Sequence, residues 1–501
     1  MSEEDDREEL RRELARREAA LEEPGGPARV ARQRRLGRMT GRERVLALVD
    51  EGSFVELGAH VLHDHAHVHE TLAANRHPGD GVVAGIGAVS GRRVVVVANE
   101  PTILRGAMGH AASRKVCRAL DLAKERGLPV VTLADSDGVR VEEGLDAVDA
   151  YGEILLRVAR LKGVVPQITV VFGLCVGAAA YAAALGDFVA MVEGQSYLFI
   201  TGPKVTKVVT GEDVTLDALG GPAMHARTTG QCHAVVKDEP SAIAWAKRML
   251  DALDPRRPAD DPVDRPTDDL ASIVPVAERR AYDMKKVLAT VFDRGSVLEV
   301  SDLFARNLVT AFARLGGRSV AVVASQPMYL AGSLDIDASR KGAAFVRFAG
   351  DHGIPVVTLV DVPGYLPGSK QEQGGILPHG ATLIDAYAHA RSPLLCLIVR
   401  KSYGGASVLS FGSAVRLALP TARVGAVGVD AQLEIELGPE PPEATAEEKA
   451  ARAARREAFV REHGHGWAAA EGGYVDRVVD PKRAREALAR ALEALDDRGA
   501  V

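Results

Sequence analysis

Residues 129–133 read Pro-Val-Val-Thr-Leu, and the same five residues return 226 positions later, at 355–359. Two further landmarks repeat at this spacing. They are Ala112-Ser-Arg-Lys115 with Ala338-Ser-Arg-Lys341, and Pro101 with Pro327, each of which follows a valine-rich run. Because three unrelated landmarks share one spacing, the sequence indicates two copies of one domain.

Within each copy, valine-rich runs alternate with helical patterns of about a dozen residues. This alternation is typical of an α/β fold in which helices cover the sheets. A Pro- and Asp-rich segment between the copies has the composition of a linker. We expect a charged N-terminal helix in residues 1–27, a first domain in 28–253, a linker in 254–267 and a second domain in 268–501.

An insertion distinguishes the first copy. Gly52-Ser53 and Gly295-Ser296 pair at a spacing of 243, so the first copy carries 17 extra residues between Gly52 and about Ala84. This insertion contains five histidines: His60, His63, His65, His67 and His69. Alternate side chains of a strand share one face, so the histidines of residues 60–69 could bind a metal if this segment is a strand. The alternative hypothesis is a solvent-facing loop. No metal ligand is assigned.

The overall composition narrows the function classes. The 501 residues include 62 Lys and Arg against 68 Asp and Glu, for a net charge of −6. No bulk positive field therefore attracts the chain to nucleic acid or to an anionic membrane. The uncharged segment 163–186 is long enough to span a bilayer, but proline and glycine interrupt it, which favours a buried strand leading into a buried helix.

The cysteines and the N-terminus predict a cytoplasmic location. The four cysteines lie far apart without a Cys-x-x-Cys pair, which argues against a zinc ribbon and a secreted disulfide framework. The N-terminus, Met-Ser-Glu-Glu-Asp-Asp, lacks the apolar run of a signal peptide.

Two small-residue turns are the places where chemistry is expected. Residues 173–178 (Gly-Leu-Cys-Val-Gly-Ala) and 403–406 (Tyr-Gly-Gly-Ala) each end a strand pattern and open a helical one. A helix start points free N–H groups at one spot, where a developing oxyanion can bind. Main-chain donors of this kind contribute about 3–4 kcal/mol each to transition-state stabilisation. The alternative is that these glycines only allow close packing of strand and helix.

Other catalytic motifs are absent from the sequence. It contains no Gly-x-Ser-x-Gly elbow, no His-Glu-x-x-His and no phosphate-binding Gly-x-x-x-x-Gly-Lys-[Ser/Thr]. Gly85, Gly87 and Gly91 have the wrong spacing for a dinucleotide fingerprint. Serine hydrolase, zinc protease and dinucleotide enzyme are therefore disfavoured.

The second copy carries long, specific motifs of a known family. They are the run 354–368 (Ile-Pro-Val-Val-Thr-Leu-Val-Asp-Val-Pro-Gly-Tyr-Leu-Pro-Gly), Gln371-Glu-Gln-Gly-Gly375, His379-Gly-Ala381 and Arg400-Lys-Ser-Tyr-Gly-Gly-Ala406. First-copy segments agree, among them residues 79–83, 199–203 and 210–215. From about Arg35 to Leu495 the chain resembles the carboxyltransferase (beta) subunit of biotin-dependent acyl-CoA carboxylases, the type represented by propionyl-CoA carboxylase.

The resemblance implies two tandem crotonase-like (ββα-spiral) domains, usually assembled as a hexamer. Such enzymes transfer a carboxyl group from carboxybiotin to the α-carbon of an acyl-CoA. By position, Gly177 and Ala178 match the pair expected to hold the thioester enolate, and Gly405 and Ala406 match the pair expected to hold the biotin ureido oxygen. The chain has no Met-Lys-Met biotin-attachment site, so the resemblance implies a separate partner, a biotin carboxylase/biotin carboxyl carrier subunit.

Several residues depart from the family pattern. Ser136-Asp-Gly-Val-Arg140 stands where the family has Ser-Gly-Gly-Ala-Arg, and Leu104-Arg-Gly-Ala107 stands where it has Phe-Gly-Gly-Ser. We expect Gly138, Val139, Arg105 and Val408 to bind substrate, and Val408 to tune the acyl group. These departures predict a specialised acyl group.

Two alternatives remain open. The same chemistry run backwards would make the protein a biotin-dependent decarboxylase or transcarboxylase acting on a malonyl-type thioester. The altered turns could also mark a non-catalytic partner within a hexamer.

Overall fold

The computed structural model describes residues 3–63, 69–255, 261–439, 441–462 and 465–495. The chain divides into two compact units, which we call the N-unit (Met1–Asp251) and the C-unit (Ala252–Val501). Residues 256–260 of the expected linker lie outside the described residues.

The described part of the N-unit is built on one eight-stranded sheet, in the order β1-β2-β3-β4-β5-β6-β8, with β7 paired to β5. Its strands are β1 (Val55–Glu56), β2 (Val82–Val89), β3 (Arg92–Asn99), β4 (Val130–Ser136), β5 (Gln167–Val176), β6 (Phe188–Val192), β7 (Tyr197–Phe199) and β8 (Ala234–Val236). Its helices are α1 (Glu3–Glu22), α2 (Pro27–Arg35), α3 (Gly41–Leu48), α4 (Glu70–Ala73), α5 (His110–Arg126), α6 (Leu145–Leu161), α7 (Ala178–Leu185), α8 (Pro203–Thr210), α9 (Leu216–Gly220), α10 (Pro222–Met224) and α11 (Glu239–Ala252). Helix α1 confirms the expected N-terminal helix.

The described part of the C-unit repeats this topology as β9-β10-β11-β12-β13-β14-β16, with β15 paired to β13. Its strands are β9 (Leu298–Val300), β10 (Leu308–Leu315), β11 (Arg318–Ser325), β12 (Val356–Val362), β13 (Leu394–Tyr403), β14 (Val415–Ala418), β15 (Arg423–Gly425) and β16 (Arg477–Val478). Its helices are α12 (Leu270–Ile273), α13 (Met284–Val291), α14 (Ile336–Asp351), α15 (Ser369–Gly374), α16 (Ile376–Ala388), α17 (Val429–Leu437), α18 (Ala446–Glu462), α19 (Gly466–Glu471) and α20 (Ala484–Ala494).

The expected α/β fold with an internal duplication is confirmed. Strands β3 and β11 begin at Arg92 and Arg318, and β4 and β12 begin at Val130 and Val356, so both pairs repeat at 226 residues. In each unit the first strand pairs are antiparallel and the central ones are parallel. Central parallel strands are covered on both faces, which is why β4 and β12 are almost entirely buried.

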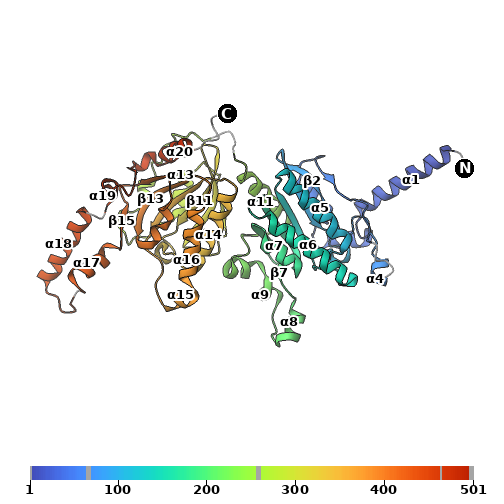
Figure 1. Cartoon of the computed structure of the whole chain (residues 1–501), viewed down its shortest axis with the longest axis horizontal. Coiled ribbons are helices and arrows are strands. Elements are labelled where there is room, and N and C mark those ends of the chain that lie inside the picture. The colour runs from blue at the N-terminus through green and yellow to red at the C-terminus, as the bar shows by residue number, and fades with distance from the viewer. Residues whose placement is uncertain (1–2, 64–68, 256–260, 440, 463–464, 496–501) are drawn as a thin grey trace. The chain divides into compact units, whose positions relative to one another are not determined.

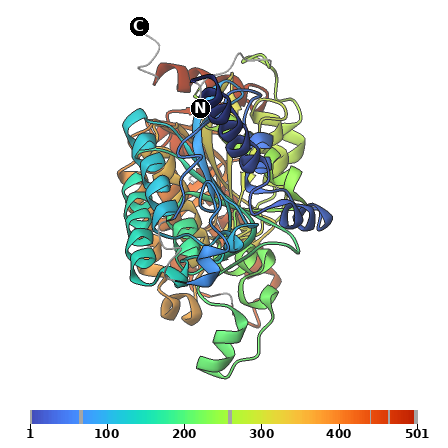
Figure 2. The same ribbon diagram turned by 90° about the vertical axis from the view of Figure 1, so that its right-hand side faces the viewer.

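Helices pack against these sheets in layers. Helices α5 and α6 lie side by side over the N-unit sheet, and α14 and α16 do so over the C-unit sheet (Figure 1). On α5, residues such as Ala112, Val116, Ala119 and Ala123 are buried at helical spacing, so one apolar stripe faces the sheet. Figure 2 shows the short helix α8, drawn in green, extending away from the sheet of its own unit.

Two expectations on special segments can be compared with the structure. The uncharged segment 163–186 forms β5 and α7, as expected for a buried strand leading into a helix. In the described ranges, no helix has both the length and the apolar character needed to cross a membrane.

The histidine-rich insertion is described only in part, since His65 and His67 lie outside the described residues. His63 is buried, and neither of its ring nitrogens has a hydrogen-bond partner among the residues that the structure describes. His69 caps α4 by accepting a hydrogen bond from the Thr71 N–H. The residues that the structure describes contain no cluster of three or more His, Cys, Asp or Glu able to hold a metal ion.

Candidate active site

The N-unit site lies at the carboxyl ends of β4 and β5, where the pairing of the two strands shifts register between Ala134 and Ser136. The turn that follows β4 places Gly138 at a φ of +90°, a conformation that favours glycine. The Gly138 N–H donates to the Ser136 hydroxyl at 3.0 Å, and the Gly138 carbonyl accepts from the Met108 N–H at 2.9 Å. Both polar groups of Gly138 are therefore used inside the protein.

The beginning of α7 corrects one expected donor. Gly177 precedes α7 with a φ of +60°, and its N–H donates to the Phe199 carbonyl of β7 at 3.1 Å. A donor already bound to its own protein does not serve a substrate oxyanion. The expectation that the Gly177 N–H is an oxyanion donor is therefore wrong, and Gly177 instead makes the turn that starts the helix.

The amides of Val139 and Ala178, which directly follow Gly138 and Gly177, are not used in hydrogen bonds among the described residues. A Cβ placed on Gly138 would lie 3.8 Å from the Ala178 nitrogen and 2.5 Å from the Val176 carbonyl oxygen. Glycine at 138 therefore lets the two turns approach, and the Val139 and Ala178 amides form what we call the N-unit amide pair. Val139 and Ala178 are both partly exposed.

The C-unit repeats this arrangement with Tyr365 and Gly405 in the equivalent positions. Tyr365 forms a bridge with Leu334, just as Val139 forms one with Met108. Gly405 is exposed, and a Cβ placed on it would lie 3.9 Å from the Tyr365 ring. No hydrogen bond between backbone groups outside the regular elements of the described chain uses the Tyr365 N–H. We call Tyr365 and Gly405 the C-unit amide pair.

Ala406 is the second donor expected in the C-unit turn. It is buried and lies third in a 3₁₀ helix that spans Gly404–Ser410. Among the described residues, no hydrogen bond joins the Ala406 N–H to a carbonyl outside this helix. Gly405, one residue earlier, is exposed. The donor roles expected of Gly405 and Ala406 both stay predictions, and the Tyr365 N–H is a further candidate donor.

Two expected substrate-binding side chains have different fates. Val408 belongs to the 3₁₀ helix Gly404–Ser410 and is fully buried in this conformation, and its expected role in tuning the acyl group stays a prediction. The Arg105 side chain is 79% exposed and forms an ion pair with Asp137. Arg105 and Asp137 are therefore two departures from the family pattern that contact each other, which the sequence did not reveal.

Buried ion pairs hold the strand ends in place. Arg44, from α3, donates to Asp135 at 2.9 Å and to Glu239 at 2.8 Å, and Arg400 donates to Asp361 at 3.0 Å. Asp135 and Asp361 occupy equivalent positions in the two copies. Burial raises the pKa of Asp135, and the adjacent Arg44 opposes that rise. The carboxylates of Asp135 and Asp361 are each bound to an arginine, so neither is available as a catalytic base.

Arg140 supports the turn that carries Val139. Its fully buried guanidinium donates to Asp80 at 2.6 Å and to Glu143 at 2.7 Å, and it also donates to the Ala107 carbonyl at 3.0 Å. Burial is the largest cause that raises the pKa of Asp80, and the Arg140 charge opposes it. The network fixes the loops on both sides of the N-unit amide pair.

The burial of Tyr365 adds a polar atom to the C-unit turn. Its hydroxyl is buried and has no hydrogen-bond partner in the described part of the chain. Its ring lies against Gly380, where a Cβ would be 3.2 Å away. Burial raises the pKa of Tyr365, so its hydroxyl stays protonated at neutral pH.

Each of the two related α/β units places main-chain N–H groups at the carboxyl ends of its parallel strands, an arrangement able to stabilise negative charge on a carbonyl oxygen. A family model described as "Carboxyl transferase domain" matches residues 32–500. The chain therefore belongs to the carboxyl transferase family and is a carboxyltransferase.

Similar proteins cover almost the whole chain. The propionyl-CoA carboxylase beta chain of Saccharopolyspora erythraea is 42% identical over 97% of this chain and 93% of its own length. The methylmalonyl-CoA decarboxylase subunit alpha of Propionigenium modestum is 38% identical over 95% of this chain and 93% of its own length. The crystal structure of transcarboxylase 12S, described as a hexamer assembly with hydrolysed methylmalonyl-coenzyme A bound, has a TM-score of 0.90 at 38% identity, over 97% of this chain and 95% of that one.

Proposed function

We propose that this protein is the carboxyltransferase component of a biotin-dependent acyl-CoA carboxylase. It transfers a carboxyl group from biotin, carried on a separate biotin carboxylase/carrier protein, to the α-carbon of an acyl-CoA. The single observation that supports this function is the presence of equivalent amide pairs in two copies of one domain. Two carbonyl compounds then each meet their own pair of N–H donors.

The N-unit amide pair is assigned to the thioester. The Val139 and Ala178 N–H groups hold the thioester oxygen, which becomes negatively charged as the α-proton leaves. The donors are fixed by the fold before the substrate arrives, so no reorganisation is needed in the transition state. Ala178 also lies at the start of α7, where the helix dipole favours a negative charge.

The C-unit amide pair is assigned to the ureido oxygen of biotin. A ureido oxygen accepts hydrogen bonds, and the exposed Gly405 together with the Tyr365 N–H matches this requirement. When bound, carboxybiotin would supply the carboxyl group and, once that group has left, a basic ureido nitrogen for the α-proton of the acyl-CoA. The chain's own residues bind and orient the two reactants and stabilise charge.

No protein side chain is required as the base, and the carboxylates near the sites agree with this. Asp135 and Asp361 bind buried arginines, and Asp137 binds Arg105. The proposal includes a hexamer, since the transcarboxylase 12S neighbour is described as a hexamer assembly. A cytoplasmic location is included as well, supported by four scattered cysteines without a Cys-x-x-Cys pair. It also includes a specialised acyl group, supported by the Arg105 and Asp137 replacements.

The experiment is a reconstitution. The purified protein is mixed with its biotinylated partner, bicarbonate, ATP and a panel of acyl-CoA thioesters, and carboxylated product is measured. We expect turnover with at least one thioester. Failure on every member of a broad panel, with the partner shown to be carboxylated, would refute the proposed function.

A second direction of the reaction is favoured by specific relatives. A methylmalonyl-CoA decarboxylase subunit and transcarboxylase 12S both resemble the chain at 38% identity. The amide pairs stabilise the same charged species in either direction. Release of CO₂ from malonyl and methylmalonyl thioesters in the presence of the biotin protein, without ATP, would show that the protein works as a decarboxylase or transcarboxylase.

A further inference from the structure

Arg105 and Asp137 form an ion pair at the edge of the N-unit amide pair. Asp137 directly precedes Gly138 and lies two residues from Val139. The Arg105 Nε donates to the Asp137 carboxylate, and the Asp137 N–H donates to the Arg105 carbonyl at 3.2 Å. The Arg105 side chain is 79% exposed and that of Asp137 is 21% exposed.

The duplicated domain provides an internal comparison for this pair. The equivalent residues in the C-unit are Ala331 and Pro363, which carry no charge. The backbone turn is nevertheless the same, since Arg105 and Ala331 have φ values of +51° and +54°. The bridge between the two loops is also retained, as Leu334 with Tyr365. The fold therefore makes this turn without an ion pair.

Stability does not account for the pair either. An exposed ion pair contributes about 0–1 kcal/mol in typical measurements. Arginine is also a poor choice for a left-handed backbone conformation, which glycine adopts at less cost. A charge placed here, beside the amides and at a position that does not need it, points to a ligand.

The free donors of Arg105 indicate which ligand. Only its Nε is used, and among the described residues the two terminal nitrogens make no hydrogen bond. A guanidinium with free terminal N–H groups matches the two oxygens of a carboxylate or phosphate. Asp137 orients the guanidinium and offsets its charge. An anion whose oxygens do not match the guanidinium therefore gains little binding energy by replacing Asp137 as its partner.

We propose that Arg105, oriented by Asp137, is a specificity-determining residue that binds an anionic group of the thioester substrate. The inference rests on the proposed function and names a property of that substrate. The anionic group is a carboxylate on the acyl moiety or a phosphate of the coenzyme, which present the same chemistry to a guanidinium.

The test compares Arg105→Ala with wild type on thioesters that differ in their anionic groups. Each acyl group is presented on coenzyme A and on pantetheine, which lacks phosphate, and acyl groups with and without a terminal carboxylate are included. The variant is expected to raise KM about tenfold for thioesters that carry the recognised anion, with kcat nearly unchanged. Arg105→Lys keeps the charge and is expected to recover part of the loss.

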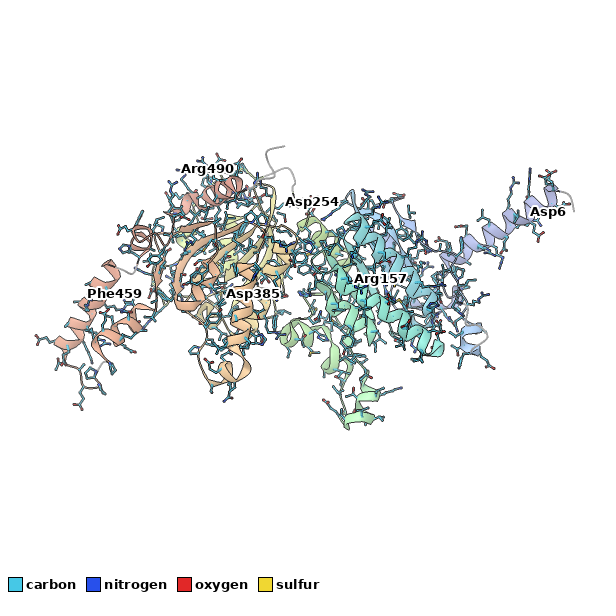
Figure 3. The ribbon with its side chains drawn as sticks, in the orientation of Figure 1. Asp6, Arg157, Asp254, Asp385, Phe459 and Arg490 are labelled. Carbon is cyan, nitrogen blue, oxygen red and sulfur yellow. The ribbon has the colours of Figure 1, made fainter. Side chains whose placement is uncertain are left out.

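The arms of the test identify the source of the anion. If it is a coenzyme phosphate, the difference between variant and wild type disappears on pantetheine thioesters. If it is an acyl carboxylate, the difference remains on pantetheine but only for acyl groups that carry the carboxylate. Arg157→Ala is the matched control, because Arg157 forms a partly exposed ion pair with Asp121 on the helix layer of the same unit and is labelled on α6 in Figure 3.

Two results would overturn the inference. One is an Arg105→Ala enzyme whose KM values equal those of Arg157→Ala on every thioester. The other is an equal rise in KM with and without anionic groups, which would mean that Arg105 only holds the loop. Binding of each thioester, measured by calorimetry on the assembled protein, gives the same comparison without turnover. A wild-type enzyme that binds thioesters but transfers no carboxyl group refutes the proposed function and leaves this comparison decisive.

Discussion

Replacing Ala178 by proline removes one N–H from the N-unit amide pair and changes little else. Ala178 is the first residue of α7, a position at which proline is well tolerated because its fixed φ suits the helix. In the described structure the Ala178 N–H binds no other protein atom, so no internal hydrogen bond is lost. Gly177 has no Cβ to clash with the proline ring. We therefore expect the free energy of unfolding to change by less than about 1 kcal/mol.

The effect on catalysis is expected to be far larger. Deletion of one main-chain-type oxyanion donor costs about 3–4 kcal/mol in the transition state, which corresponds to a loss of about 10²–10³-fold in kcat. The KM for the acyl-CoA should change much less, because the uncharged ground-state carbonyl is a weaker acceptor than the enolate. The assay is carboxyl transfer to the acyl-CoA by the reconstituted complex, with assembly checked by light scattering.

Ala178→Gly is the matched control, because it keeps the N–H while changing the same side chain. It should retain activity within a few-fold of wild type. A folded, assembled Ala178→Pro enzyme with more than about a third of wild-type kcat would refute the donor role. So would a glycine variant that loses as much activity as the proline variant, since the loss would then follow the side chain.

Three further predictions concern stability. Arg140→Met should lower the free energy of unfolding by about 3–5 kcal/mol in a denaturant titration, because Asp80 and Glu143 stay buried without a partner, and an equal loss for Arg157→Met would contradict this. Lys341→Met should lower the free energy of unfolding by about 3 kcal/mol or more. The Lys341 ammonium donates to three buried carbonyls at 2.7–2.9 Å, and each carbonyl left without a donor costs about 1–3 kcal/mol. A near-wild-type melting curve would contradict this stabilising role. Burial lowers the pKa of His225 below its ordinary 6.5, so the unfolded chain takes up the proton before the folded one does. The free energy of unfolding should therefore fall as the pH drops from 6.5 to the lowered folded-state pKa. His225→Gln should flatten this slope, and an unchanged slope would contradict the assignment.

The architecture was predictable from the sequence because short identical segments occur in both copies of the domain at one spacing. Pro-Val-Val-Thr-Leu occupies the start of β4 and of β12, where both faces of the strand are buried and few other residues fit. The longer spacing of 243 between the glycine-serine pairs also reappears, since β1 begins at Val55 and β9 at Leu298. The spacing between equivalent buried strands matches the spacing between the sequence landmarks, because positions in a packed core tolerate few changes.

The donors at the amide pairs were only half predictable. Sequence reasoning pointed to adjacent residues in one turn of each unit, Gly177 with Ala178 and Gly405 with Ala406. It could not show that β7, a strand of three residues, returns to bind the Gly177 N–H. Nor could it show that the second donor of each pair comes from the turn after the preceding strand. A three-residue strand has too little periodicity to be recognised, and the approach of two turns depends on tertiary contacts.

The comparison of the two copies separates what the fold requires from what a ligand requires. Features present in both units, such as the left-handed turn at Arg105 and Ala331 and the bridge that follows it, serve the fold. The charge on Arg105 and the buried Arg140 network are each present in the N-unit only, since Ala331 and Leu366 stand in their places in the C-unit. Arg140 is buried and contributes to stability, whereas Arg105 is exposed and contributes little. By this reasoning the exposed, unmatched charge is the part of the N-unit turn that was selected for the substrate.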